Sequence, residues 1–354
     1  MVPGEVDAIR LAWPEVGAEE LAAVAAVLET GMLTMGPLGA EFEAELAKAC
    51  ETRHAFAVSS GTAALHLAVV ALGLQPGDEV LVPAYTFPAT ANVVALSGLK
   101  PVLVDVDPVT MNMDPAKIVV GPRTKAIMPV HIFGRPARIE ELPDLPLVED
   151  AAGALGARRG GRACGSLGLV ACQSFHPRKI VTTGEGGGVT TNDDRIAAKV
   201  AEFRNHGWRS LADGDMPAAG LNYRISDILL AVGLPQLRRL DELLAARTRL
   251  ADGYSERLAQ LPVTVPVADE GDVHGWQAYV IQVERRDEVL AALRAQGIEA
   301  QIGTYALPLL GAYRDQGFFP GAEHAFEHAL ALPFHTRLGE AELDRVAEAL
   351  GRLL

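Results

Sequence analysis

The sequence predicts an α/β domain built around a mostly parallel β-sheet, followed by a smaller α+β domain. Short, almost wholly apolar runs alternate with helical patterns over the first half of the chain, as expected for strands that helices cover on both faces. Long helical patterns begin after Asn222, and strand-like and helical runs share the remainder. We therefore expect a large domain over residues 1–244 and a small C-terminal domain over 245–354.

The composition argues against several classes of protein, namely nucleic-acid-binding, secreted and membrane proteins. The 354 residues include 31 basic and 45 acidic side chains, a net charge of −14, and 49% apolar residues. This balance predicts a large core and argues against a nucleic-acid binder, which needs a basic surface. Three cysteines without CxxC spacing indicate a reducing compartment. Without a signal peptide or an 18-residue apolar stretch, we expect a cytoplasmic protein that contacts no membrane.

The first elements are helical. Residues 19–29 carry apolar side chains at helical spacing and end before Gly31, a favourable C-terminal cap. The loop GMLTMGP follows, and then a second helix in which Leu38, Phe42 and Leu46 recur every four positions.

Seven apolar runs are then predicted as strands. In order they are HAFAV (54–58), EVLVPAYTF (79–87), PVLVDVD (101–107), AIMPVHIF (126–133), LPLVED (145–150), LVACQSF (169–175) and GGVTT (187–191). The turn at residues 59–62 links the first strand to an apolar helix, an arrangement that binds anions. Ligands of such sheets bind beyond the carboxyl ends of the strands, so polar residues there are the candidates for a site.

The later elements are a helical pattern over residues 227–250, with an interruption or kink expected at Pro235. Its arginines, Arg238, Arg239 and Arg247, are expected on a solvated face. The runs AYVIQVER and DEVLAALRAQG and a helix over 340–354 then predict the small α+β domain.

Asp150 ends one predicted strand and should be buried, so its carboxylate needs a partner. Two interpretations are open. Asp150 either caps a following helix or balances the charge of a protonated ring nitrogen.

Lys179 follows another strand, close to Ser174 and His176. It is either an exposed loop residue or a Schiff-base lysine. A lysine amine suits the second role because burial shifts its pKa readily and the neutral amine attacks aldehydes.

These residues together match the needs of pyridoxal phosphate. The cofactor requires a lysine for its aldehyde, an acid for its ring nitrogen, a flat apolar surface for its ring, and hydroxyls with a helix N-terminus for its phosphate. The chain offers, in order, Gly61, Thr62, Phe87, Asp150, Ser174 and Lys179.

The strings VSSGTAALHLA, GDEVLVPAYTFPATANVV, VEDAAGALGA, SFHPRKIVTTGEGGGVTTND, FRNHG and GLNYRISDI resemble the DegT/DnrJ/StrS family of sugar aminotransferases. The resemblance runs from about residue 10 to the C-terminus. It implies fold type I of the pyridoxal-phosphate enzymes, with a mostly parallel seven-stranded sheet, and a cytosolic homodimer whose active sites lie at the subunit interface.

The resemblance also implies roles for individual positions. Lys179 matches the lysine that forms the internal aldimine, and Asp150 matches the acid on the ring nitrogen. The remaining matches are Phe87 for ring stacking, Gly61, Thr62 and Ser174 for the phosphate, Asn222 for the phosphate of the neighbouring subunit, and His176 and Tyr305 as substrate-side or packing residues. One departure is Gly153, near which the family usually carries Gln or His.

The resemblance implies transfer of an amino group from an amino acid, with L-glutamate as the expected donor, to a keto sugar, most often nucleotide-linked. Two alternatives stay open: a sugar dehydratase or epimerase, and a catalytically silent cofactor-binding regulator. Lys179 argues against the dehydratase branch, in which a histidine replaces it.

Two further patterns are given structural interpretations. His324, Glu327 and His328 fit HxxEH, but too little chain follows to offer a third ligand, and we expect no metal site. The basic cluster at 157–162 predicts an exposed hairpin.

Overall fold

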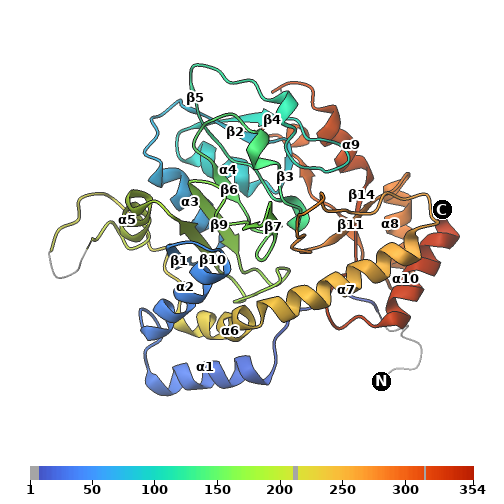
Figure 1. Cartoon of the computed structure of the whole chain (residues 1–354), viewed down its shortest axis with the longest axis horizontal. Coiled ribbons are helices and arrows are strands. Elements are labelled where there is room, and N and C mark those ends of the chain that lie inside the picture. Colours follow the sequence, from blue (N-terminus) through green and yellow to red (C-terminus); the bar gives the residue numbers. More distant parts are fainter. Residues whose placement is uncertain (1–7, 210–213, 315) are drawn as a thin grey trace.

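A seven-stranded sheet forms the centre of the larger part of the molecule (Figure 1). The computed structural model describes residues 8–209, 214–314 and 316–354. In this part of the chain the sheet consists of β1 (His54–Val58), β10 (Gly187–Thr191), β9 (Val170–Ser174), β6 (Val148–Asp150), β5 (Thr124–Ile127), β2 (Glu79–Pro83) and β4 (Lys100–Val104), in that spatial order.

The predicted mostly parallel sheet is confirmed. Strand β10 runs antiparallel to both β1 and β9, whereas the pairs β6–β9, β2–β4 and β2–β5 are parallel. Isolated parallel bridges, Ile127 to Leu147 and Val130 to Asp150, join β5 to β6. The seven apolar runs of the sequence all contribute a strand.

The described residues also form shorter strands. These are β3 (Tyr85–Thr86) with β13 (Tyr305–Ala306), the hairpin β7 (Arg158–Arg159) and β8 (Arg162–Ala163), and a separate sheet of β11 (Tyr279–Gln282), β14 (Ala329–Leu332) and β12 (Gln301–Ile302). The predicted hairpin at 157–162 is thus present as β7 and β8.

Helices cover the sheets. They are α1 (Ala18–Thr30), α2 (Pro37–Ala49), α3 (Gly61–Ala71), α4 (Ala89–Leu96), α5 (Asp194–Phe203), α6 (Asp227–Arg238), α7 (Leu240–Leu258), α8 (Arg286–Ala295), α9 (Pro320–His328) and α10 (Glu340–Leu353), with short 3₁₀ turns η1 (Pro115–Lys117), η2 (Ile132–Gly134), η3 (Ile139–Glu141) and η4 (Leu307–Leu309). Within the described ranges, no helix is both long and apolar enough to cross a membrane.

Helix α3 shows how the sequence sets the position of a helix on the sheet. The Ser60 hydroxyl accepts a hydrogen bond from the Ala63 N–H at 3.0 Å and caps the helix. Leu65, Leu67 and the alanines of the helix are buried, and the helix packs against β9 and β10. The helix therefore begins at the edge of the sheet where β1 ends.

Two expectations for the later helices are wrong. Helix α6 runs through Pro235, and the interruption lies at Arg239, because burial of the leucines of α6 outweighs one missing N–H bond. Arg247 is buried rather than solvated, and its Nη1 donates to the Trp276 and Gln277 carbonyls at 2.8 and 3.1 Å. The boundary expected at 244/245 falls inside α7, and the division into domains stays a prediction.

The segment 269–277, which leads into β11, lies against residues 131–138, which follow β5. The Gly275 N–H donates to the Gly134 carbonyl at 2.8 Å, and the Gln277 N–H donates to the Phe133 carbonyl at 3.0 Å. Gly134 has φ +99°, and a Cβ there would lie 2.7 Å from the Trp276 nitrogen. Only glycine therefore allows this approach of the two backbones.

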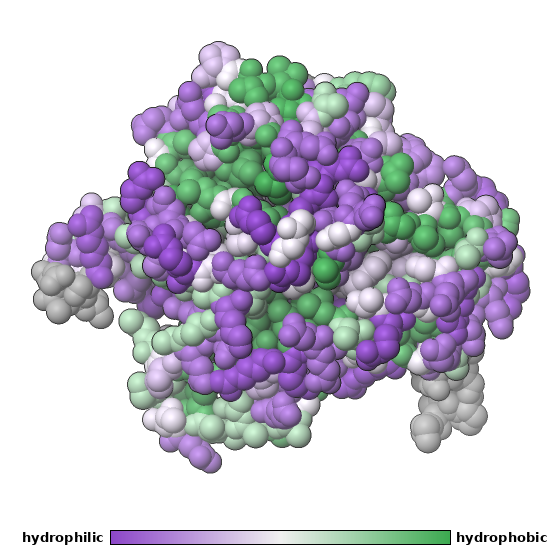
Figure 2. All heavy atoms as spheres, viewed as in Figure 1, coloured by the Kyte–Doolittle hydropathy of each residue, from purple (hydrophilic) through white to green (hydrophobic). Residues whose placement is uncertain are grey.

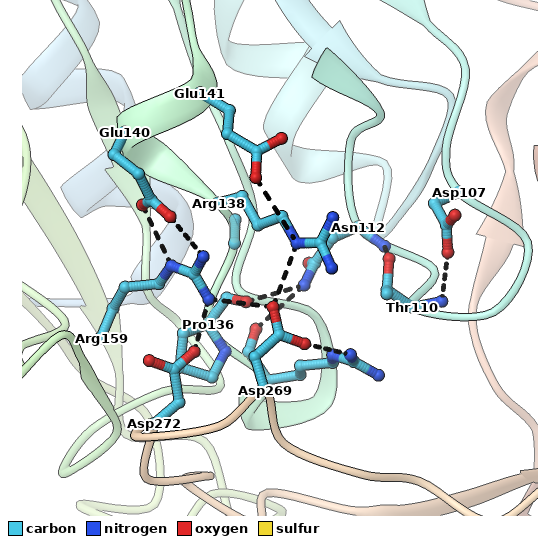
Figure 3. A network of polar contacts seen from close by, with 12 residues as sticks. Asp107, Thr110, Asn112, Pro136, Arg138, Glu140, Glu141, Arg159, Asp269 and Asp272 are labelled. Atoms are coloured by element: carbon cyan, nitrogen blue, oxygen red, sulfur yellow. Dashed lines mark hydrogen bonds and ion pairs between the residues drawn. The ribbon is translucent and has the colours of Figure 1, made fainter. Parts of the chain in front are cut away.

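Figure 3 shows a polar network that fastens the same segment. Asp269 accepts hydrogen bonds from Arg135 at 2.6 Å, Arg138 at 3.0 Å and Arg159 at 3.1 Å, and Arg159 also binds Asp272 at 2.5 Å. Burial alone would raise the pKa of Asp269. The hydrogen bonds from the three arginines have the larger, opposite effect and lower this pKa to about 2.

Replacement of Asp269 by Asn should lower the free energy of unfolding at pH 7 by on the order of 2 kcal/mol, since three guanidinium groups lose their shared carboxylate. Because the folded pKa lies below the unfolded value of about 3.9, this contribution is present above about pH 4 and is lost as the pH falls towards 2. Urea titrations at several pH values measure it. Exposed Glu270 supplies the control, Glu270→Gln, and equal urea midpoints for both variants would contradict the prediction.

Candidate active site

Asp150 lies buried at the carboxyl end of β6. Its Oδ2 accepts a hydrogen bond from the Thr90 hydroxyl at 2.8 Å, and its Oδ1 accepts one from the Ala152 N–H at 3.2 Å. Burial raises the pKa of this carboxyl group. The helix-cap interpretation is wrong, because turns and not a helix follow Asp150. The carboxylate is held in place and has only neutral hydrogen-bond donors.

Thr90 was missed by the sequence analysis. It is fully buried on α4, and its hydroxyl lies between the Asp150 carboxylate and the Phe87 carbonyl, 3.1 Å away. A threonine within an apolar helix gives no local signal of this contact, which joins positions 60 residues apart.

Lys179 lies in the turn after β9, where its N–H donates to the His176 carbonyl at 2.8 Å. Burial lowers the pKa of Lys179 to about 8, against the opposing charge of Asp150, and the Arg178 guanidinium adds to the decrease. The structure thus brings Lys179 within electrostatic range of Asp150, and a sizeable fraction of the amine is neutral near pH 7 to 8.

Gly61 and Ser174 lie side by side at the start of α3. A Cβ at Gly61 would lie 2.9 Å from the Ser174 Cβ and 3.1 Å from its hydroxyl oxygen. Thr62 is the next residue of the helix and is exposed. The first N–H groups of a helix have no partner within the helix. Gly61, Thr62 and Ser174 therefore form a suitable group for a phosphate.

Two aromatic residues meet near Thr90. Strand β3 pairs with β13, which brings Phe87, directly after β3, to a centroid distance of 6.3 Å from the Tyr305 ring. Phe87 is 62% exposed, although the preceding residue, Thr86, is buried. It offers an open aromatic face one helical turn from Thr90.

His176 and Asn222 make local contacts. The His176 Nδ1 accepts a hydrogen bond from the Arg178 N–H at 3.2 Å, and burial lowers the pKa of this imidazole. The Asn222 Oδ1 accepts one from the Arg224 N–H at 3.3 Å. The role predicted for Asn222 across a subunit interface stays a prediction.

The space beside Gly153 is filled by a residue that is distant in sequence. A Cβ at Gly153 would lie 3.5 Å from the Gln277 Oε1 and 3.6 Å from its Cβ and Cγ. The Gln277 amide also donates to the Arg178 carbonyl at 3.4 Å. An amide side chain from segment 269–277 thus reaches the surroundings of Lys179, next to the position where the sequence lacks one.

Behind Asp150, a buried pair supports the end of β6. Glu149 points to the other face of the strand and accepts hydrogen bonds from the His131 Nε2 at 3.0 Å, the Gly165 N–H at 2.8 Å and the Gly168 N–H at 2.5 Å. The His131 N–H in turn donates to the Asp150 carbonyl at 3.1 Å. These contacts fix the backbone that carries the Asp150 carboxylate.

The HxxEH pattern lies on α9. The rings of His324 and His328 stack at a centroid distance of 4.1 Å, and the His324 Nε2 lies 3.2 Å from the Gln282 Oε1. Within residues 8–209, 214–314 and 316–354, no three metal-binding side chains come together. Glu327 and its neighbours form part of an ordinary helix surface.

The model of the DegT/DnrJ/EryC1/StrS aminotransferase family matches residues 14–351. GDP-perosamine synthase of Caulobacter vibrioides is 40% identical to the chain over 364 residues, which covers 98% of each protein.

Solved structures show the same fold. S. venezuelae DesV, in complex with a ketimine intermediate, is 36% identical and superposes with a TM-score of 0.90 over 95% of this chain and 94% of its own. The PLP-form of the putative sugar aminotransferase Spr1654 from Streptococcus pneumoniae is 28% identical, with a TM-score of 0.92 over 98% of this chain and all of its own.

Proposed function

Because the chain belongs to the DegT/DnrJ/EryC1/StrS aminotransferase family, we propose that it transfers an amino group from L-glutamate to a nucleotide-linked keto sugar. The family makes it a pyridoxal-phosphate-dependent aminotransferase. The names of its relatives, a GDP-perosamine synthase and a sugar aminotransferase, support a sugar acceptor. The observation that carries the proposal is the buried Asp150 carboxylate, held by the Thr90 hydroxyl and the Ala152 N–H, within electrostatic range of the Lys179 amine.

The described residues fit the cofactor. Asp150 is a buried carboxylate with no cationic hydrogen-bond partner, which suits a protonated ring nitrogen. Phe87 offers its exposed ring for stacking, and the group at the start of α3, Gly61 with Thr62 and Ser174, suits the phosphate. Lys179 is the proposed point of attachment. When bound, the cofactor supplies an aldehyde carbon and a ring that accepts electron density.

The residues of the chain then act on protons. With the cofactor and the amino donor bound, the Nζ of Lys179 would take the proton from the donor Cα. A pKa of about 8 for Lys179 keeps part of this amine neutral. Asp150 holds a proton on the ring nitrogen, and the Thr90 hydroxyl fixes the orientation of the carboxylate. His176 and Tyr305 are proposed to face the sugar.

The proposed homodimer is supported by apolar side chains that the single chain leaves open. Leu21 and Leu28 on α1 are 72% and 56% exposed, and Met35 in the loop after it is 59% exposed. Figure 2 shows pale green atoms along the lower edge of the molecule, where Figure 1 places α1. A second subunit would cover such a surface, and the proposed dimer would bring Asn222 to the phosphate of its partner.

Absorption spectroscopy tests the proposal. The protein with bound cofactor should lose its absorption band on addition of L-glutamate, and a nucleotide-linked keto sugar should restore the band. A band that glutamate leaves unchanged would instead favour the silent regulator. Loss of oxygen from the sugar without amino transfer would favour the dehydratase.

A further inference from the structure

A small cavity lies beside the proposed cofactor residues. Its volume is about 80 Å³, and its walls include apolar side chains of Leu11, Phe133, Ile302 and Phe334 together with polar ones of Arg178, Gln277 and Gln301. Gln277 contacts Gly153, three residues after Asp150, and Arg178 directly precedes Lys179. The cavity is thus linked to the proposed cofactor residues through Arg178 and Gln277, whereas Lys179 and Asp150 themselves are not among its lining residues.

Arg178 gives this cavity an uncompensated positive charge. Its Nη1 donates to the Gln301 Oε1 at 2.6 Å, and no carboxylate in the described part of the chain forms an ion pair with it. By contrast, Arg135, Arg138 and Arg159 all share Asp269. The charge of Arg178 also lowers the pKa of Lys179 and of His176. The neutral amide of Gln301 therefore positions the Arg178 guanidinium without neutralising its charge, and this charge is available to bind an anion.

The shape of the cavity indicates which anion binds. Apolar walls that end at a guanidinium suit methylene groups that end in a carboxylate. Pockets for nucleotide-sized ligands run from about 300 Å³ upwards, so this cavity is too small for a nucleoside diphosphate. A neighbouring open groove of about 480 Å³ is larger, and the exposed Arg178 side chain lines it as well, together with Arg294 and Glu299. The Glu299 carboxylate opposes the binding of a highly charged diphosphate there more than that of a single carboxylate.

We propose that Arg178, held in place by Gln301, binds the side-chain carboxylate of an acidic amino-acid donor and thereby selects glutamate or aspartate over neutral amino acids. This inference rests on the proposed function, whose first half-reaction it refines. Gln277 lines the cavity and also lies next to Gly153, where an added Cβ would be in ordinary van der Waals contact with it.

The test compares donors in the half-reaction of the protein with bound cofactor. Arg178→Gln should lower kcat/KM for glutamate by about 10- to 100-fold, the range of a hydrogen bond to a charged group. It should lower kcat/KM for alanine much less, because alanine loses only the effect of Arg178 on the pKa of Lys179. Arg178→Lys should recover part of the loss because it keeps the charge but not the planar fork. Arg294→Gln, which removes an exposed arginine of the larger groove, is the matched control and should behave as the wild type.

A second measurement does not depend on turnover. Binding of 2-oxoglutarate, followed through its effect on the absorption of the bound cofactor, should weaken by the same factor in Arg178→Gln, with the urea midpoint unchanged. An equal loss for glutamate and alanine, no loss, or a loss confined to the keto sugar would each overturn the inference. If no amino acid converts the wild-type protein, the proposed function itself fails, which is a different result.

Discussion

Lys179→Ala should abolish transamination, with a loss of at least about 10⁴-fold, because one substitution removes both the point of attachment and the base. The residue lies within electrostatic range of Asp150, and burial lowers its pKa to about 8, which allows the neutral amine to act near that pH. The absorption band of the covalently bound cofactor should be absent in the variant, and borohydride should fix the cofactor to the Lys179 peptide only in the wild type.

Lys199→Ala is the matched control for this experiment, since Lys199 is exposed on α5. It should retain the band and the rate. A Lys179→Ala protein that still binds the cofactor covalently, or that still transfers amino groups at a comparable rate, would remove the basis of the proposed mechanism.

Asp150→Asn should lower the rate of the half-reaction by about 10²- to 10³-fold, the usual effect of removing one group that stabilises developing charge. The substitution keeps the shape of the side chain and an oxygen for the Thr90 hydroxyl, but it removes the charge and the oxygen that accepts the Ala152 N–H. Binding of the cofactor should weaken much less than the rate, since the phosphate and ring contacts remain. Stopped-flow absorption gives the rate, and equilibrium titration gives the affinity.

The loss of rate in Thr90→Val is the comparison for the loss in Asp150→Asn. It removes the hydroxyl that orients the carboxylate but keeps the charge of Asp150, so its loss of rate should be smaller than that of Asp150→Asn. An Asp150→Asn protein with the wild-type rate, or a larger effect of Thr90→Val, would contradict the role assigned to the carboxylate.

Local pattern was enough to predict the central sheet and the residues at its carboxyl edge. Each apolar run became a strand, and Asp150 and Ser174 lie at strand ends as expected. Burial on both faces produces such runs, so the strand positions are encoded in short stretches of sequence. The antiparallel direction of β10 depends on the strand with which it pairs, so the residues of β10 alone do not predict it.

Contacts between distant positions explain what sequence reasoning missed. Gln277 reaches Gly153, and the Thr90 hydroxyl reaches Asp150, through the packing of elements far apart in the chain. Arg247 was placed on a solvated face because arginine is seldom buried. Its burial is stabilised by two carbonyls of segment 269–277. The pattern of apolar residues in a helix does not predict where this segment lies.

The pairing of β1 affects how the protein folds during synthesis. Strand β1 ends at Val58, and its strand partner in the described part of the chain, β10, begins at Gly187. Contacts that span so much sequence slow folding, because a large loop must close first. A ribosome adds roughly 5–20 residues per second, so β1 waits several seconds, with its strand edge exposed, before its partner emerges. During this interval the unpaired edge of β1 is open to pairing with other chains, which favours aggregation.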